Sequence, residues 1–352
     1  LPMPKRGWVE DGSYVATGGT SSLRLPPDWA ISGAGMVHCV LNVGLDELID
    51  VDASGTKYKA NSIESRIASA ASKGGLTVHI RLHVGENAPA YWRTACGTVR
   101  IIDSRFGKDA EVPCWWKDTY LELYNAAMIA LAPAINSNPI IGSVSAPGGA
   151  CFYPEPNLFF PDKDGNQGRM DAAGWNAADH LRFMMTFPRY HSVFTKVVEL
   201  AVNPPKLGGL DYKAFAETLI ATMPLGYACI SNYSMSQDRE AGGMARQYEW
   251  MSSIASRAWI GVQLARSHVI SINKSETVWD EMAMISATDY HMHFVETTGK
   301  VDASHYDEGI ANSWTESYIS RVDSMKASAA VMLANPAPSE TGGAPPPMPC
   351  PE

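Results

Sequence analysis

The feature that most constrains the fold is a regular alternation of short apolar segments with segments of helical period. Eight segments have the character of strands, namely residues 7–10, 36–43, 76–84, 140–145, 196–203, 226–233, 259–265 and 290–296. Helical patterns separate most successive pairs, at residues 61–72, 120–135, 175–187, 212–222, 244–257 and 277–288. This alternation predicts an α/β fold with a parallel sheet covered by helices, and eight strands predict closure into a (β/α)8, or TIM, barrel.

Two excursions and a tail complete the predicted organisation. Residues 98–102 and their neighbours predict a hairpin after the third strand, and a long loop is expected after the fourth, from Pro147 to Arg169. A last helix is expected at residues 317–333. Residues 1–334 are therefore interpreted as one barrel domain, and residues 335–352, rich in Pro, Gly and Ala, as a linker or disordered tail.

Composition and charge exclude several classes of protein. Apolar residues make up 45% of the chain and charged residues 18%, as in a globular protein. A net charge of −9 without clustered Lys or Arg argues against nucleic acid or an anionic membrane as partner. No run of eighteen apolar residues indicates a membrane span, and no secretion signal is visible. Cys96 and Cys114 flank the predicted hairpin and fit either an extracellular disulfide or buried free thiols.

The third predicted strand carries three polar residues on one face. Its alternation places His79, Arg81 and His83 on one side, opposite the apolar residues at 76, 78, 80 and 82. In a parallel barrel these polar side chains point into the lumen, and His83, nearest the carboxyl end of the strand, lies at the mouth. The alternative is that the three residues satisfy one another inside the barrel.

A stiff loop after the fourth strand carries a carboxyl group. Pro147-Gly148-Gly149 allows a sharp turn, and Glu155 then stands between two prolines, just beyond Phe152. Partly apolar surroundings raise the pKa of a carboxyl, which suits a general acid at neutral pH. The alternative is a solvated loop glutamate without a catalytic role.

Other residues at the predicted mouth complete a candidate site. A carboxylate pair across the mouth is what glycoside cleavage requires, and Glu296 and Glu199 are the candidates to join Glu155. Aromatic and polar side chains would bind the sugar. The predicted substrate-binding residues are Arg81, His83, Trp92, Asn203, Tyr233 and Gln263.

A family resemblance adds to this interpretation. Its landmarks are Gly7-Trp8, residues 61–71 running into residues 75–81, Ala88-Pro89, Pro113 to Trp116, residues 124–139, and Gly148-Gly149 leading to Glu155. Their order resembles that of barrel glycosidases of the β-galactosidase and cellulase superfamily, especially their glycosidase-like branch. The resemblance implies that Glu155 is the acid/base and that the nucleophile is a Glu at the end of the seventh strand.

The chain departs from that pattern on its seventh strand. Gln263 stands in this region, and an amide cannot serve as a carboxylate nucleophile. Three explanations are open. The strand count is wrong by one and Glu296 is the partner, or Glu199 substitutes from the fifth strand, or the barrel binds a glycan without cleaving it.

Two groups of residues have the ligand types of metal sites. His291 and His293, with Asp302, His305 and Asp307, suit a metal-dependent hydrolase, although histidines at alternate strand positions also occur as inward-facing barrel residues. Asp162, Asp164 and Asn166 resemble the start of a calcium loop, with the wrong glycine spacing for an EF-hand. A structural calcium or a plain polar turn fits this loop.

The sequence thus predicts a glycoside hydrolase that acts on a cell-surface or polysaccharide glycan, requires no cofactor, and works outside the cell or at its surface. One alternative is a catalytically silent glycan-binding barrel, attached through its tail to a surface or phage-tail assembly. A metal-dependent hydrolase is the second alternative.

Overall fold

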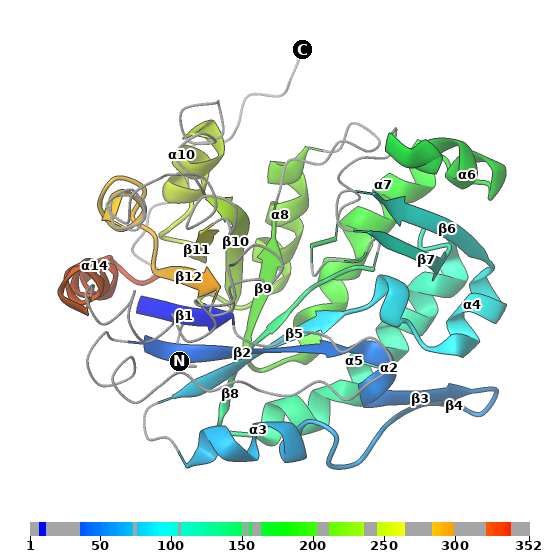
Figure 1. Cartoon of the computed structure of the whole chain (residues 1–352), viewed down its shortest axis with the longest axis horizontal. Helices are drawn as coiled ribbons and strands as arrows, with labels where there is room; N and C mark the ends of the chain where they lie inside the picture. The colour runs from blue at the N-terminus through cyan, green and yellow to red at the C-terminus, as the bar shows by residue number, and fades with distance from the viewer. Residues whose placement is uncertain are drawn as a thin grey trace, which may run out of the picture.

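Eight parallel strands form a closed barrel at the centre of the fold (Figure 1). The computed structural model describes residues 7–11, 36–72, 76–104, 107–149, 152, 155–156, 163–202, 211–235, 245–264, 284–298 and 322–338. In chain order the barrel strands are β1 (Gly7–Asp11), β2 (Met36–Gly44), β5 (Thr77–His83), β8 (Ile141–Ser145), β9 (Val197–Ala201), β10 (Ala228–Met235), β11 (Trp259–Leu264) and β12 (Phe294–Thr298). Each pairs with the next, and β12 pairs with β1. The predicted α/β barrel is confirmed, and every strand overlaps its predicted segment.

Alternation along the strands separates an outer face from an inner one. Val78, Ile80 and Leu82 of β5 belong to the large apolar core that packs against the helices. A smaller apolar cluster lies on the opposite face, inside the barrel, and consists of Val40, Val197, Cys229, Trp259 and Phe294. Gly261 is needed beside this cluster, because a Cβ there would overlap the Phe294 ring. These residues form an apolar floor toward the amino ends of the strands.

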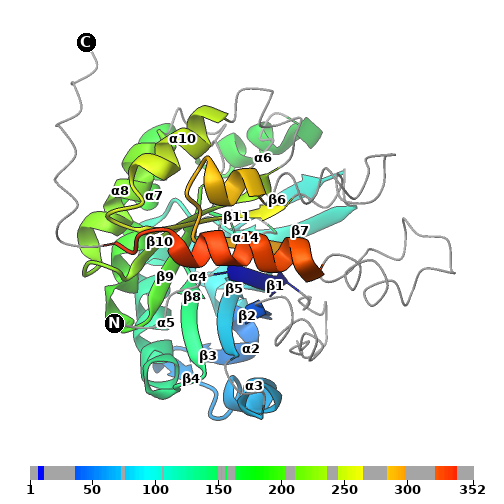
Figure 2. The ribbon, with the colours of Figure 1, turned by 90° about the vertical axis from the view of Figure 1, so that its left-hand side faces the viewer.

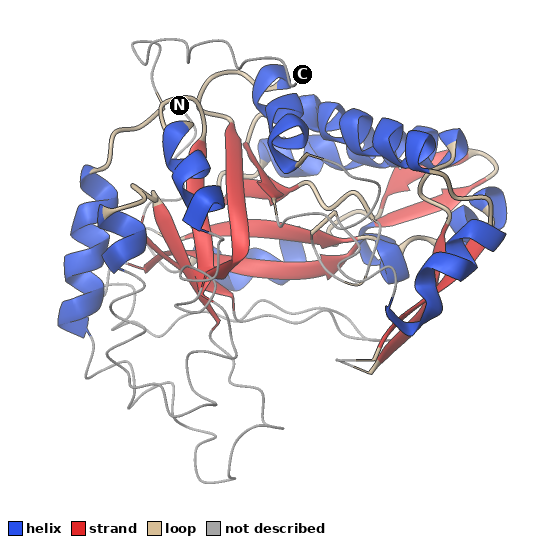
Figure 3. Ribbon diagram, turned by 90° about the horizontal axis from the view of Figure 1, so that it is seen from above, coloured by secondary structure: helices blue, strands red, loops and turns tan. Residues whose placement is uncertain are grey.

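Helices surround the barrel, as Figures 1 and 3 show. They are α2 (Leu45–Leu48), α3 (Glu64–Ala71), α4 (Ala90–Cys96), α5 (Asp118–Ser137), α6 (Asn166–Ala172), α7 (Ala177–Thr186), α8 (Tyr212–Thr222), α10 (Ala245–Ser253) and α14 (Val322–Ala334), with 3-10 turns η1 (Gly85–Asn87), η2 (Lys163–Gly165) and η3 (Phe187–Val193). Most of the predicted helices are confirmed, and α14 packs beside β1 (Figure 2). The helix expected at residues 277–288 lies largely outside the described residues.

Two antiparallel hairpins extend from the barrel. The strands β6 (Thr98–Asp103) and β7 (Lys108–Pro113) form the hairpin predicted after the third barrel strand. The pair β3 (Ile49–Asp52) and β4 (Gly55–Tyr58) was not predicted. Of the loop expected after the fourth strand, residues 150–151, 153–154 and 157–162 lie outside the described part, and its last residues form η2 and α6.

The chain after α14 packs against the barrel. Asn335 donates from Nδ2 to the carbonyls of Ala287 and Met292, at 3.0 and 2.9 Å. The carbonyl of Pro336 accepts a hydrogen bond from His293 Nε2 at 2.8 Å. Packing thus continues into the first residues of the predicted tail, whereas residues 339–352 are not described, and the domain boundary stays a prediction. None of the helices described above is long and apolar enough to cross a membrane.

Candidate active site

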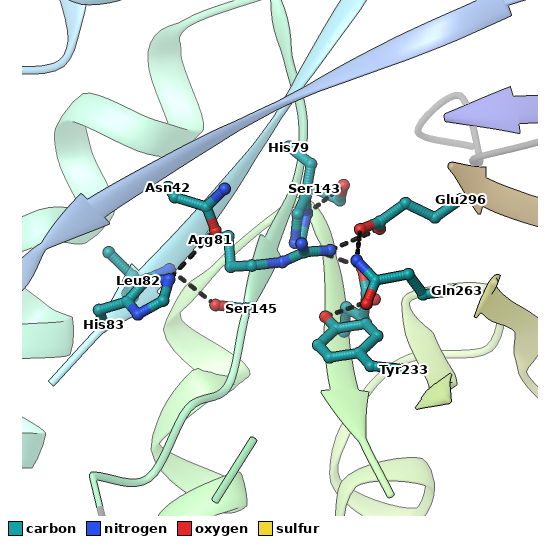
Figure 4. A network of polar contacts seen from close by, with 11 residues as sticks. Asn42, His79, Arg81, Leu82, His83, Ser143, Ser145, Tyr233, Gln263 and Glu296 are labelled. Atoms are coloured by element: carbon teal, nitrogen blue, oxygen red, sulfur yellow. Dashed lines mark hydrogen bonds and ion pairs between the residues drawn. The ribbon is translucent and has the colours of Figure 1, made fainter. Parts of the chain in front are cut away.

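Polar side chains fill the barrel above its apolar floor. Phe294 and Val197 of the floor each stand two residues before a glutamate, Glu296 on β12 and Glu199 on β9. The polar layer therefore lies toward the carboxyl ends of the strands, where barrels of this type carry their active sites. Its members are Asn42, His79, Arg81, His83, Ser143, Ser145, Glu199, Ser231, Tyr233, Gln263 and Glu296, and Figure 4 labels all of them except Glu199 and Ser231.

Arg81 and Glu296 form a buried ion pair across the barrel. Arg81 Nη2 lies 2.5 Å from Glu296 Oε2, and both side chains are almost completely shielded from water. Gln263 donates from Nε2 to the other carboxylate oxygen at 2.6 Å. Figure 4 shows Arg81 extending from β5 to reach this pair. A guanidinium in direct contact favours the charged form of a carboxyl, so Glu296 is held as an oriented anion.

Glu199 is the centre of a second chain of contacts. The Tyr233 hydroxyl donates to Glu199 Oε1 at 2.8 Å, and His79 Nε2 lies 3.3 Å from Oε2. The other ring nitrogen of His79 is hydrogen-bonded to Ser143 Oγ at 2.8 Å. The Arg81 guanidinium carbon lies 4.5 Å from the centre of the Tyr233 ring. The two buried carboxylates are thus linked through Tyr233 and Arg81 into one network.

The protonation of Tyr233 follows from this environment. Burial raises the pKa of its hydroxyl well above the ordinary value, Arg81 opposes the shift, and the charges of Glu199 and Glu296 add to it. Tyr233 therefore stays a neutral hydrogen-bond donor over the working range of pH.

His83 lies at the edge of the network and touches the loop after β8. Its Nε2 is 3.1 Å from Asn42 Oδ1. Burial and, to a smaller extent, the positive charge of Arg81 lower the pKa of His83 to about 3. A hydrogen bond with the backbone of Phe152 opposes this shift. His83 is therefore neutral near pH 7, and Phe152, three residues before Glu155, lies next to it at the carboxyl end of β5.

Glu155 itself is 8% exposed. Its loop begins with two glycines of positive φ, Gly148 at 67° and Gly149 at 115°. Pro156 returns to this turn, since a Cβ on Gly148 would lie 3.0 Å from Pro156 Cβ. The prediction that Glu155 forms a carboxylate pair with Glu199 or Glu296 across the barrel mouth stays a prediction.

This chain is similar to several solved structures in its three-dimensional fold. No protein-family model and no curated protein sequence match it. The catalytic domain of the major endoglucanase from Xanthomonas campestris pv. campestris superposes with a TM-score of 0.50 at 10% identity, over 84% of this chain and 86% of that one. The chain shares the fold of that endoglucanase domain. The predicted resemblance to cellulase-type barrels is confirmed at the level of the fold.

Two further solved structures are similar at lower scores. An endocellulase from the archaeon Pyrococcus horikoshii has a TM-score of 0.47 at 10% identity, covering 85% of this chain and 84% of that one. The endo-glycoceramidase II from Rhodococcus sp. has a TM-score of 0.45 at 12% identity, covering 84% of this chain and 71% of that one.

The strand order excludes one of the three explanations offered for Gln263. Gln263 lies on β11, the seventh barrel strand, and Glu296 lies opposite it on β12, the eighth. The predicted strand count is therefore confirmed, and the explanation that it was wrong by one is excluded. An amide therefore occupies the seventh strand, where the resemblance implied a glutamate.

Trp92 requires a correction. Its side chain is completely buried, and its ring meets those of Tyr120 and Tyr124 edge-on at centroid distances of 5.1 and 6.4 Å. Trp92 therefore has no free face on which a sugar could stack, and it belongs to the core between α4 and α5. Asn203, predicted to bind substrate, lies outside the described residues.

Of the predicted metal ligands, His293 is bonded within the protein through both ring nitrogens. The two ring nitrogens of His293 bond to the Ile260 amide, at 3.1 Å, and to the Pro336 carbonyl. His291 precedes β12 and is exposed, so the two histidines do not share a strand face. Asp302, His305 and Asp307 are not described, and no cluster of metal-binding type occurs among the residues that are.

The predicted calcium loop is described only in part. Asp162 is not described, whereas Asp164 accepts a hydrogen bond from the Ser104 amide at 3.0 Å and Asn166 accepts one from the Ile102 amide at 2.9 Å. These side chains fasten the loop to the β6–β7 hairpin. The calcium site stays a prediction.

Several residues of the site escaped the sequence analysis. Ser143 was read only as part of a strand, although its alternation with Ser145 on β8 indicated a polar inner face. Tyr120 and Tyr124 were included only as members of the helix expected at residues 120–135. Cys96 and Cys114 are buried free thiols, and burial, with the neighbouring Cys114, raises the pKa of Cys96 to about 11.

Proposed function

We propose that this chain is a glycoside hydrolase that cleaves a cell-surface or polysaccharide glycan by means of two carboxyl groups. The observation that carries the proposal is the anion Glu296, held by Arg81 and by the partly exposed Gln263 in a barrel of endoglucanase fold. A fixed anion beneath the mouth of such a barrel suits the stabilisation of an oxocarbenium-like transition state.

Glu155 is the proposed proton donor. Phe152, three residues before it, contacts His83 at the carboxyl end of β5 through its backbone, and Glu155 is a largely buried residue. Loops that follow barrel strands supply the working residues in this architecture. Arg81, His83, Tyr233 and Gln263 are proposed to bind the sugar or to orient the carboxylates.

Glu296 is the preferred partner because a nucleophile or base must be ionised, and Arg81 secures that state. Glu199 is the second choice, since Tyr233 and His79 both contact it. A carboxyl separation of about 5–5.5 Å would predict retention of configuration, and about 6.5–9.5 Å inversion.

The test compares wild type with Glu155→Gln on a panel of aryl glycosides and cell-wall polysaccharides. Loss of general-acid assistance should lower the rate on natural glycosides by about 10²- to 10⁴-fold. Aryl glycosides with very good leaving groups need no such assistance and should retain more activity. Glu296→Gln should lower the rate on both kinds of substrate. Equal activity of Glu155→Gln and wild type would refute the proposal.

One observation favours a second candidate, the catalytically silent glycan-binding barrel. Glu296 and Glu199 are both fully shielded from water, and the seventh strand offers an amide in place of a carboxylate. Binding of a polysaccharide without turnover across the panel would support this candidate. An extracellular location and attachment through the C-terminal tail are part of both proposals.

A further inference from the structure

Two tyrosines of α5 hold the turn from which the Glu155 loop starts. Tyr120 donates from its hydroxyl to the Gly148 carbonyl at 2.8 Å, and the Gly148 amide donates to the Tyr124 hydroxyl at 3.3 Å. The two residues stand four apart on one face of the helix, with rings stacked at 6.1 Å. Both polar backbone groups of Gly148 are therefore bonded to tyrosine hydroxyls.

The chain of hydrogen bonds continues to His191. His191 Nδ1 lies 3.2 Å from the Phe187 carbonyl and must donate to it, while Nε2 lies 3.3 Å from the Tyr124 hydroxyl. Burial lowers the pKa of His191 to about 4, so the ring is neutral near pH 7 and its Nε2 is an acceptor. Tyr124 thus accepts from Gly148 and donates to His191, which fixes the direction of its hydroxyl.

The turn is closely fitted to these two side chains. A Cβ on Gly149 would overlap the Tyr120 hydroxyl, and its φ of 115° disfavours any other residue. Gly148 also lies against Phe187, at 3.0 Å from an added Cβ, and Pro156 returns to the same glycine. Gly148 at the start of this loop is therefore held by the tyrosines of α5, and Pro156, the residue after Glu155, lies close to the same glycine.

We propose that Tyr120 and Tyr124 are positioning residues that set the place of Glu155 at the barrel mouth. This inference rests on the proposed function of Glu155 as proton donor. Misplacement of a catalytic group by about 1 Å can lower a rate by about 10²-fold. Loss of either hydroxyl should therefore weaken general-acid catalysis while the carboxyl group itself stays in the chain.

The test uses Tyr120→Phe and Tyr124→Phe, with Tyr58→Phe as the control. Tyr58 also accepts a backbone amide bond, from Ile63 at 3.0 Å, and donates to Glu64 at 2.6 Å, but its hydroxyl serves α3 and not the Glu155 loop. Hydrogen exchange of the Gly148 amide reports on the turn without any substrate. The rates are measured on the 4-nitrophenyl and 2,4-dinitrophenyl forms of the glycoside that wild type cleaves.

We expect exchange at Gly148 to become at least about tenfold faster in Tyr124→Phe and to stay unchanged in Tyr58→Phe. We expect kcat on the 4-nitrophenyl glycoside to fall by about 10- to 100-fold in both loop variants, with a much smaller loss on the dinitrophenyl form and little change in KM. A purely structural role would lower both rates alike.

Two results would overturn the inference separately from the proposed function. Unchanged exchange at Gly148 would show that the tyrosines do not hold the turn. Faster exchange with no selective loss on the 4-nitrophenyl form, while Glu155→Gln does lose activity there, would leave Glu155 as proton donor and remove the positioning role. If Glu155→Gln loses nothing, the proposed function fails, and the positioning role fails with it.

Discussion

Removal of Arg81 from its ion pair is the sharpest test of how Glu296 is held. Arg81→Met keeps the length and apolar stem of the side chain but leaves the Glu296 carboxylate, 2.5 Å from the lost guanidinium, buried without that charge partner. Breaking a buried pair from one side typically costs about 3–5 kcal/mol, because the remaining charge is not rehydrated. The ratio of folded to unfolded protein should fall by roughly 10²- to 10⁴-fold.

A double-mutant cycle separates this coupling from lost packing. Glu296→Gln alone removes the carboxylate that Arg81 contacts, whereas the double variant removes both charges and should cost clearly less than the sum of the two single changes. Free energies of unfolding come from urea titrations at pH 7, with unchanged m-values as the condition for comparison.

The exposed pair of Arg100 and Asp109, 2.6 Å apart, serves as the matched control. Solvent screens this pair, so Arg100→Met should change stability little. Additive effects in the Arg81 cycle, or an Arg81→Met cost no larger than that of Arg100→Met, would refute the reasoning that Arg81 holds Glu296 as a buried anion.

Two further predictions concern pH and metal. Burial lowers the pKa of His191 from 6.5 to about 4, so the unfolded chain binds more protons between these values, and the contribution of His191 to the free energy of unfolding should be complete above pH 6.5 and decrease by roughly 3 kcal/mol as the pH drops toward 4. His83 and His180, whose pKa values burial also lowers, add to this decrease, so His191→Gln should remove only its own share of the fall in urea midpoints, and an unchanged profile would contradict the assignment. Exhaustive chelation should leave glycosidase activity intact and lower the Tm if Asp162 and its neighbours hold calcium. Activity that is lost on chelation and restored by zinc or manganese would instead favour the metal-dependent hydrolase.

The barrel was predictable because its signal is local and repeated. Each strand of the barrel contains a short apolar run that indicates a strand. Alternation within β5 correctly separated Val78, Ile80 and Leu82 from the polar residues between them. Errors arose where alternation was extended past the real strand. His291 and His293 were read as neighbours on one strand face, but β12 begins only at Phe294, and His291 has a φ of 53°.

The partners within the site were not predictable from the sequence. Arg81 and Glu296 are 215 residues apart, and nothing local to either specifies the other. Trp92 shows the same limit for aromatic residues, since its burial depends on how α4 packs against α5. The two hydroxyls that hold Gly148 belong to a helix whose pattern indicates only an apolar stripe.

Gln263 and Glu296 are best understood together. They lie opposite each other in the register of β11 and β12, and the amide nitrogen donates to the carboxylate at 2.6 Å. A carboxylate in place of Gln263 would put a second negative charge at hydrogen-bond distance from Glu296, with Arg81 as the cation that touches Glu296, and one of the two carboxyls would have to hold a proton. An ionised Glu296 on the eighth strand is therefore matched by a neutral hydrogen-bond donor, Gln263, on the seventh strand. The anion expected at this corner of the barrel is therefore on β12, where Arg81 contacts it, and Gln263 of β11 orients it as a neutral donor.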